Sequence, residues 1–412
     1  MALIRDNELY QHFMHYINLH KQKCGVTGRY NVEPCPCSIC SDFKQSGQSR
    51  MFMNCIGECK EWTTPQSTSK APYYKVALDA LEENKAKIRK VIVLGDIHRD
   101  LIGFIVALYE AGIIDERLQY ANVDKERIDV VVSCGDIIDG HRTSENPYNE
   151  GNEREEIDLF QVIEYLNSLR GKSDKGLYVV STCGNHESMR KEGNIKNKGE
   201  DQVDWPVGHL SNYMAQHFPL MIQIGKCVFS HTLPNDMKSF SRLVGDIGQG
   251  GAIDHLNNLF FNYMVDVEST LRMDKNAALY KMLWDRDVIE NICDGIGDFR
   301  SFLKCEDCIF FIGHTNAQCY KKKHCNPDGY QKGLCNYKVH AMDTNWSKSF
   351  LTQPVKKQVI SYAIVTDIHG QPKVEAAKID KVFQHQRPRP LQFGEIGHSM
   401  SKYKKNFSFR ML

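Results

Sequence analysis

Short runs of apolar, mostly β-branched residues that end in a polar residue limit the fold of this chain more than any other feature. Four such runs are KVIVLGD (90–96), DVVVSCGD (129–136), LYVVSTCGN (177–185) and CIFFIGH (308–314). Their length and composition predict buried strands. Residues 101–112 and 157–171 carry apolar residues spaced three and four apart, which predicts helices between strands. Strands alternating with helices indicate an α/β sheet.

The later part of the chain predicts a different arrangement. Three more strands are expected without intervening helices, at residues 221–231, 338–344 and 357–367. We therefore expect a second, more antiparallel sheet. The expected organisation is a Cys-rich N-terminal segment (1–70), a main domain (71–380) containing a mostly helical insertion (236–285), and a polar tail (381–412).

Polar motifs follow five of the predicted strands. They are GDIH (95–98), GDIID (135–139), GNHE (184–187), SHT (230–232) and GHT (313–315). Open α/β sheets gather their binding groups at the carboxyl ends of strands. Aspartate, histidine and asparagine are ligands suited to Mn, Fe or Zn dications. A single Asp or His after a strand is most often a turn former or a helix cap, so the ordered set of five carries the metal-site prediction.

This ordered set resembles the signature GDxH, GDxxD, GNH(E), H, GH of the calcineurin-like metallophosphatase superfamily, over residues 88–370. The GNHE form resembles the phosphoprotein phosphatases. LWDRD (283–287) and GHT followed by MDT (342–344) resemble their bacterial-like branch and the related diadenosine tetraphosphatases. The resemblance implies an α/β/β/α sandwich of two mixed sheets flanked by helices, with residues 71–380 as the catalytic domain.

The resemblance also implies a site for two divalent ions, either Mn, Fe or Zn. The implied ligands are Asp96 and His98 for the first ion, Asp136 as the carboxylate bridging both, and Asn185, His231 and His314 for the second. In this chemistry a metal-bridging hydroxide attacks phosphorus in line. His186 is the expected acid that protonates the leaving oxygen, and Asp139 is its expected orienting partner.

A phosphate clamp is expected as well, because a planar guanidinium matches two phosphate oxygens. Arg286 in LWDRD is the first candidate. The family usually places an arginine directly after the aspartate of GDxxD, where this chain has Gly140. Arg142 and Arg99 are the candidates to replace it. For each arginine the alternative is a solvated loop residue.

The 15 cysteines are expected to be reduced. No secretory signal and no apolar run long enough to cross a bilayer is visible, which predicts an intracellular, reducing location without membrane attachment. Cys37, Cys40, Cys55 and Cys59 have spacing that approximates a zinc ribbon holding one structural Zn; Cys24 and Cys35 leave the ligand set open. The alternative is reduced, unliganded thiols.

A second cysteine group surrounds the predicted strand at 308–314. It comprises Cys305, Cys308, Cys319, Cys325 and Cys335, with His324 nearby. Packing as small apolar side chains is expected here in preference to zinc binding.

The expected function is hydrolysis of phosphomonoesters, foremost phosphoserine or phosphothreonine in proteins, or of small phosphoesters. The 52 basic and 51 acidic residues nearly balance, so composition does not indicate a nucleic-acid partner. Diadenosine tetraphosphate or other nucleotide hydrolysis is the alternative within the class. DNA nuclease activity is less favoured because of GNHE and LWDRD. A phosphatase-shaped binding protein without turnover is the third alternative, supported by Gly140.

Overall fold

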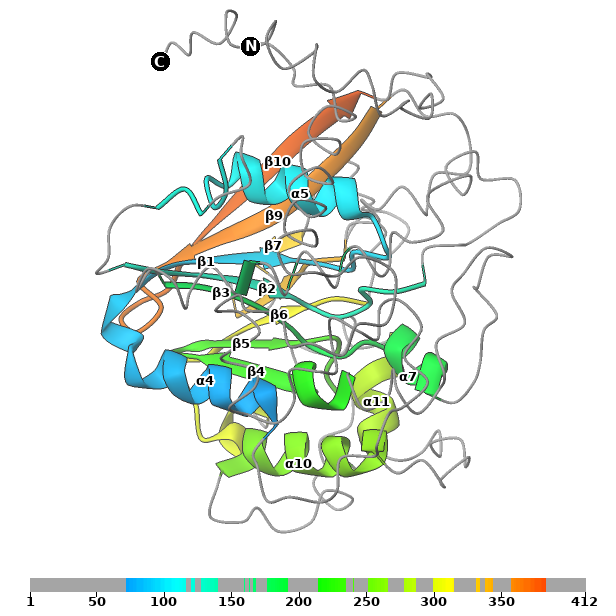
Figure 1. The fold of residues 1–412 in the computed structure, drawn as a ribbon. Coiled ribbons are helices and arrows are strands. Elements are labelled where there is room, and N and C mark those ends of the chain that lie inside the picture. The colour runs from blue at the N-terminus through cyan, green and yellow to red at the C-terminus, as the bar shows by residue number, and fades with distance from the viewer. Residues whose placement is uncertain are drawn as a thin grey trace, which may run out of the picture.

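The computed structural model describes residues 72–382 with gaps, the longest at 140–158, 192–213, 315–330 and 344–356. Two five-stranded sheets form its centre (Figure 1). The first has the order β10-β9-β1-β2-β3, with β1 (Ile88–Leu94), β2 (Ile128–Ser133), β3 (Gly176–Ser181), β9 (Lys357–Thr366) and β10 (Lys373–Val382). The second has the order β4-β5-β6-β8-β7, with β4 (Met221–Ile224), β5 (Cys227–Ser230), β6 (Ile309–Ile312), β7 (Gln331–Gly333) and β8 (Val339–Ala341).

Helices cover the outer sides of the two sheets. Figure 1 shows α5 over the first sheet and α4 and α10 beneath the second. The helices are α4 (Tyr73–Glu83), α5 (Leu101–Glu110), α7 (Asn185–Lys191), α10 (Gly251–Val265) and α11 (Ala278–Trp284), with a short 3-10 turn η1 (Lys85–Lys87). In the described part of the chain, no helix combines the length and apolar character needed to span a membrane.

Alternation along the strands explains the layers. Val91 and Val93 of β1 are buried in one core cluster together with Phe229 of β5 and Phe311 of β6. Ile92 and Leu94 of the same strand belong to a second cluster that includes residues of α5. Successive side chains of a strand point to opposite faces, so a strand that is apolar at every position is buried on both sides. The predicted α/β fold of two mixed sheets flanked by helices is confirmed.

Strand placement corrects the expected second sheet. β9 was expected there, but it pairs antiparallel with β1 and extends the first sheet. The second sheet is mixed, because β5, β6 and β8 run parallel while β4 and β7 pair antiparallel at its edges. β10 was not predicted, and it continues to Val382, two residues into the expected tail. The helices α10 and α11 lie within the expected insertion at 236–285.

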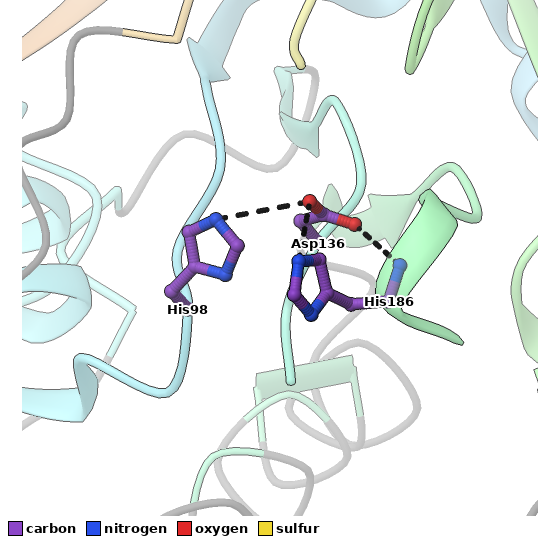
Figure 2. Close-up of side chains that lie close together, drawn as sticks. All are labelled: His98, Asp136 and His186. Carbon is purple, nitrogen blue, oxygen red and sulfur yellow. Dashed lines mark hydrogen bonds and ion pairs between the residues drawn. The ribbon is translucent and has the colours of Figure 1, made fainter. Parts of the chain in front are cut away.

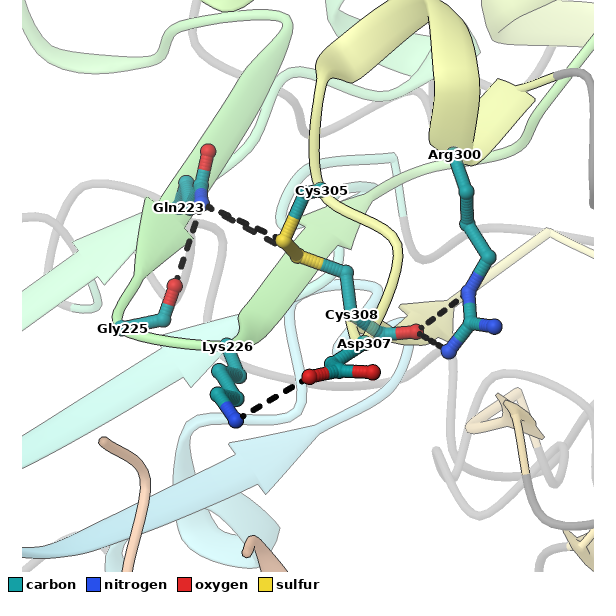
Figure 3. The surroundings of a disulfide bond; sticks show 7 residues. All are labelled: Gln223, Gly225, Lys226, Arg300, Cys305, Asp307 and Cys308. Carbon is teal, nitrogen blue, oxygen red and sulfur yellow. Dashed lines mark hydrogen bonds and ion pairs between the residues drawn. A yellow bond between two sulfur atoms is a disulfide. The ribbon is translucent and has the colours of Figure 1, made fainter. Parts of the chain in front are cut away.

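The cysteines beside β6 correct a second expectation. Cys305 and Cys308 are joined in a disulfide, where reduced side chains were expected (Figure 3). The Cys308 N–H donates to the Cys305 carbonyl at 3.2 Å and closes a turn between the two residues. Their Cα atoms are 5.4 Å apart. Separations of this size permit a disulfide. Gln223 Nε2 lies 3.8 Å and 3.9 Å from the two sulfurs. The expected zinc ligands Cys37, Cys40, Cys55 and Cys59, and Cys319, Cys325, Cys335 and His324, lie outside the described residues.

Candidate metal centre

Six predicted ligands come together where strands of both sheets end. Asp96 and His98 follow β1, Asp136 follows β2, and Asn185 follows β3; His231 follows β5, and His314 follows β6. All six side chains are buried. Parallel strands bring their carboxyl ends to one edge of each sheet. Packing of the two sheets then brings together residues more than 200 positions apart: the His314 N–H donates to Asp96 Oδ1 at 3.1 Å.

One group of donors surrounds a first oxygen of Asp136. The ligand atoms of His98, Asp136 and His186 lie within 4.8 Å of one another (Figure 2). Asp136 Oδ2 is 3.7 Å from His98 Nε2 and 3.8 Å from His186 Nε2. Asp96 Oδ2 lies 3.9 Å from the same His98 nitrogen. The predicted ligands of the first ion are therefore adjacent, with His186 beside them.

A second group of donors meets the other oxygen of the same carboxylate. Asp136, His231 and His314 also place ligand atoms within 4.8 Å of one another. His231 Nε2 is 3.4 Å from Asp136 Oδ1 and 2.9 Å from Asn185 Oδ1. Asp136 is the residue common to both groups, which is the position that the family resemblance implies for a bridging carboxylate.

Tautomers of the two histidines fit cation binding. His98 Nδ1 is 3.3 Å from the Ile138 carbonyl, and His231 Nδ1 is 2.8 Å from the Cys134 carbonyl. A carbonyl oxygen only accepts, so a proton on Nδ1 of each neutral ring has an acceptor there. The Nε2 lone pairs then face carboxylate and amide oxygens, an arrangement of electron-rich atoms that a cation between them would stabilise.

The electrostatics of the site also fit a dication. Burial, then Asp343 and Asp136, raise the pKa of Asp96 well above its usual value. Burial lowers the pKa of His231. Burial, then the nearby His231 and Arg286, lower the pKa of His314 well below its usual value. Both imidazoles are therefore held in the neutral form that binds metal. Neither ring nitrogen of His314 makes a hydrogen bond of normal geometry with a described residue. Buried nitrogens without such partners are costly unless something else binds them.

The backbone is strained at these residues. Among the described non-glycine residues, seven have positive φ, and five of them are predicted site residues: His98 (44°), Arg99 (63°), Asp136 (50°), Asp139 (60°) and His314 (59°). Each such conformation costs on the order of 1–3 kcal/mol, and strain of this kind concentrates at functional sites. The glycines of the motifs serve close approach, since a Cβ at Gly184 would overlap Asp136 and one at Gly313 would overlap Asp96.

His186 and Asp139 form the expected pair. His186 Nδ1 lies 3.4 Å from Asp139 Oδ2, and both side chains are buried. The other ring nitrogen, Nε2, faces Asp136. A proton donor at Nε2 would therefore point into the cluster, with Asp139 fixing the ring from behind.

The arginine candidates differ in position. Arg286 has an exposed side chain at the edge of the second donor group, where its guanidinium donates to the His314 carbonyl at 3.1 Å. Its loop is tied down by Thr232 Oγ1, which donates to the Asp285 carbonyl at 2.8 Å. Arg99 is buried, and its Nε has no hydrogen-bond partner among the described residues. Arg142 lies outside the described residues.

Two buried carboxylates were missed as functional candidates. Asp343 follows β8 in the MDT motif and is close enough to raise the pKa of Asp96. Glu187, the last residue of GNHE, accepts backbone N–H groups from the loops that carry Asp136 and Asn185. Burial, then Asp136, raise the pKa of Glu187 to about 8, while those N–H groups lower it. The available sequence signals were the place of Asp343 in the MDT motif and that of Glu187 in the GNHE motif.

Comparison with known proteins agrees with this geometry. The family model described as calcineurin-like phosphoesterase matches residues 89–341, which include all six predicted ligands of the two-ion site. The search of curated proteins gives no match. Since the matched region is more than half of the 412 residues, the chain belongs to the calcineurin-like phosphoesterases, a family of phosphoester hydrolases that generally use divalent metal ions.

Proposed function

We propose that this protein is a dinuclear-metal phosphomonoesterase of the serine/threonine protein phosphatase type, close to the bacterial-like branch. The observation that carries the proposal is the sharing of Asp136 between two groups of donors. Two dications about 3.5–4 Å apart repel each other and need an anion between them. A carboxylate with one oxygen toward each group meets that need.

The residues divide into two ligand sets. Asp96, His98 and Asp136 would hold one ion, and Asp136, Asn185, His231 and His314 would hold the other. Ions bound there would supply Lewis acidity and activate water for attack on phosphorus. The donor set of imidazole, carboxylate and amide suits Mn, Fe or Zn.

The remaining side chains would handle the substrate. His186, oriented by Asp139, would protonate the leaving oxygen from Nε2. Arg286 would bind phosphate oxygens at the outer edge, where its exposed guanidinium can reach a substrate held on the protein surface. Arg99, a buried arginine that directly follows His98 in the chain, would add positive charge. A phosphorylated protein segment is the proposed substrate, and an intracellular location is proposed with it.

The test is hydrolysis of p-nitrophenyl phosphate and of a phosphoserine and phosphothreonine peptide panel with added Mn²⁺, with diadenosine tetraphosphate as competitor. We expect Mn²⁺-dependent release of phosphate from peptides and weak competition by the dinucleotide. Efficient cleavage of the dinucleotide, with no release of phosphate from the peptides, would support nucleotide hydrolysis instead. Metal binding without turnover of any of these compounds would support a binding protein.

Replacement of Arg286 tests the phosphate clamp. We expect Arg286→Ala to lower kcat/KM by roughly 100-fold or more, because charge developing on the phosphoryl oxygens is met by a preorganised bidentate donor. Arg286→Lys should recover little, since an ammonium lacks the planar fork. The measurement is steady-state hydrolysis together with inhibition by inorganic phosphate.

The matched control is Arg89→Ala, which removes an exposed arginine near the opposite end of β1. We expect this variant to keep wild-type kinetics. If Arg286→Ala leaves both kcat/KM and phosphate inhibition unchanged, Arg286 does not contact phosphate, and Arg99 and Arg142 remain as candidates.

A further inference from the structure

Glu187 lies at the junction of the two loops that carry Asp136 and Asn185. It stands in the first turn of α7, and its side chain is fully buried. Oε2 accepts from the N–H groups of Asp136 at 3.1 Å and Gly184 at 2.7 Å. Oε1 accepts from those of Ile137 at 2.8 Å and Ile138 at 3.2 Å. One carboxylate therefore satisfies four backbone donors on two loops.

These contacts begin where the sheet pairing ends. β2 and β3 pair in parallel as far as Ser133 and Ser181, and the Thr182 N–H still reaches the Ser133 carbonyl at 3.0 Å. Beyond that point the loops leave the sheet. The hydrogen bonds of Glu187 then replace the ladder as the connection between the two loops.

The loop after β2 needs hydrogen-bond acceptors in this place. Asp136 is left-handed, at φ 50°, and three successive N–H groups from Asp136 to Ile138 converge on one side. Such a concave run of N–H groups binds anions. Each oxygen of Glu187 accepts from two N–H donors, so the side chain acts as an acceptor at both oxygens. Without this acceptor, the buried donors would be unsatisfied and the strained turn could relax.

We infer that Glu187 is a positioning residue whose carboxylate holds the turn in which Asp136 faces both groups of metal-binding side chains. It contacts backbone N–H groups of the loops, and its effect on the site passes through Asp136 and Asn185. This inference rests on the proposed metal-binding role of Asp136. The reciprocal bond from the His186 N–H to Asp136 Oδ1, at 2.9 Å, aligns the same carboxylate from the α7 side.

Glu187→Gln tests the inference, because glutamine has nearly the same shape but only one acceptor oxygen. Its NH₂ group would face two N–H donors. We expect the Kd for Mn²⁺, measured by calorimetric titration of the metal-free full-length protein, to rise about 10-fold to 100-fold, the usual effect of losing a residue that orients metal ligands. Catalytic activity is not needed for this measurement.

Asp129→Asn is the matched control. Asp129 is a buried carboxylate near the start of β2, bonded to Tyr120 and Arg127 and remote from the loop after this strand. We expect it to lower the free energy of unfolding while leaving Mn²⁺ affinity unchanged. A folded Glu187→Gln variant with wild-type Mn²⁺ affinity would overturn the inference, as would an equal loss of affinity in Asp129→Asn.

Hydrogen exchange of the wild type covers the case in which Glu187→Gln does not fold. After chelation of metal, the amides of Asp136, Ile137, Ile138 and Gly184 should exchange as slowly as those of β2. Exchange at the rate of an open loop would contradict the inference. Mn²⁺ binding by a wild-type protein that hydrolyses no phosphoester would refute the proposed function and leave the positioning role intact, whereas absence of Mn²⁺ binding would refute both.

Discussion

Asp136→Asn is expected to lower turnover by roughly 1,000-fold and to reduce bound divalent metal to one ion or none per chain. The two oxygens of Asp136 face different donor groups, at 3.7 Å from His98 Nε2 and 3.4 Å from His231 Nε2. An asparagine keeps the shape but removes the negative charge. Its NH₂ group would also turn a donor toward one set of ligands. Loss of the carboxylate charge therefore weakens the binding of both ions, whereas loss of any other ligand should weaken the binding of only one.

Metal analysis of the purified variant, alongside phosphatase kinetics, gives the result. Asp129→Asn makes the same chemical change near the start of the same strand, so it controls for damage to β2. Two ions per chain together with near-normal activity in Asp136→Asn would refute the bridging assignment. Normal metal content with lost activity would mean that the carboxylate acts on substrate or water only.

The strands that lead into the site were predictable because they are buried on both faces. β1, β2 and β6 are apolar at nearly every inner position, and each ends at a glycine-containing polar motif. Parallel strands of one sheet present their carboxyl ends at the same edge, so adjacency of Asp96, Asp136 and Asn185 follows from pattern and topology rules alone. Their proximity to His231 and His314 required the packing of the second sheet on the first.

Pairing partners of the last strands could not be predicted in the same way. β9 comes after β8 in the chain, yet it joins β1 in the other sheet. The local sequence indicates how buried and how long a strand is, but it does not indicate which sheet edge the strand pairs with. Residues 373–379 of β10 are all exposed or half-buried, so no buried run marks it as a strand. The hairpin with β9 supplies its hydrogen bonds.

Glu187 and the Cys305–Cys308 disulfide escaped prediction for a different reason. A glutamate after a metal ligand is compatible with a solvated helix terminus, and only the course of two loops shows four N–H groups around it. A reducing compartment predicts free thiols, but Cys305 and Cys308 are three positions apart, and the local turn decides how close their side chains lie. Both features depend on the path of the backbone in loops and turns, and the types of the residues concerned do not determine that path.

His186→Ala is expected to lower turnover of alkyl phosphates by about 100-fold to 10,000-fold, the usual contribution of a general acid. An alkoxide leaving group needs the proton, whereas p-nitrophenolate leaves readily without one, so the aryl ester should lose far less. Asp139→Asn should change the rates on the two substrates in the same direction but less, because it weakens the contact with His186 Nδ1 at 3.4 Å and keeps the imidazole itself. Paired kinetics on a phosphoserine peptide and p-nitrophenyl phosphate measure this ratio.

The position of His186 makes metal content the decisive companion measurement. Its Nε2 lies 3.8 Å from Asp136 Oδ2 and shares a donor group with His98, so the ring could bind metal where a proton donor is proposed. A general acid should leave two ions bound in His186→Ala and produce a selective loss on alkyl esters. A ligand should release an ion and lower both activities equally, because every substrate depends on the same activated water. A larger loss of activity on the alkyl ester than on the aryl ester, with two ions still bound, would therefore identify His186 as the general acid. Equal losses on both esters, with one ion missing, would identify His186 as a metal ligand.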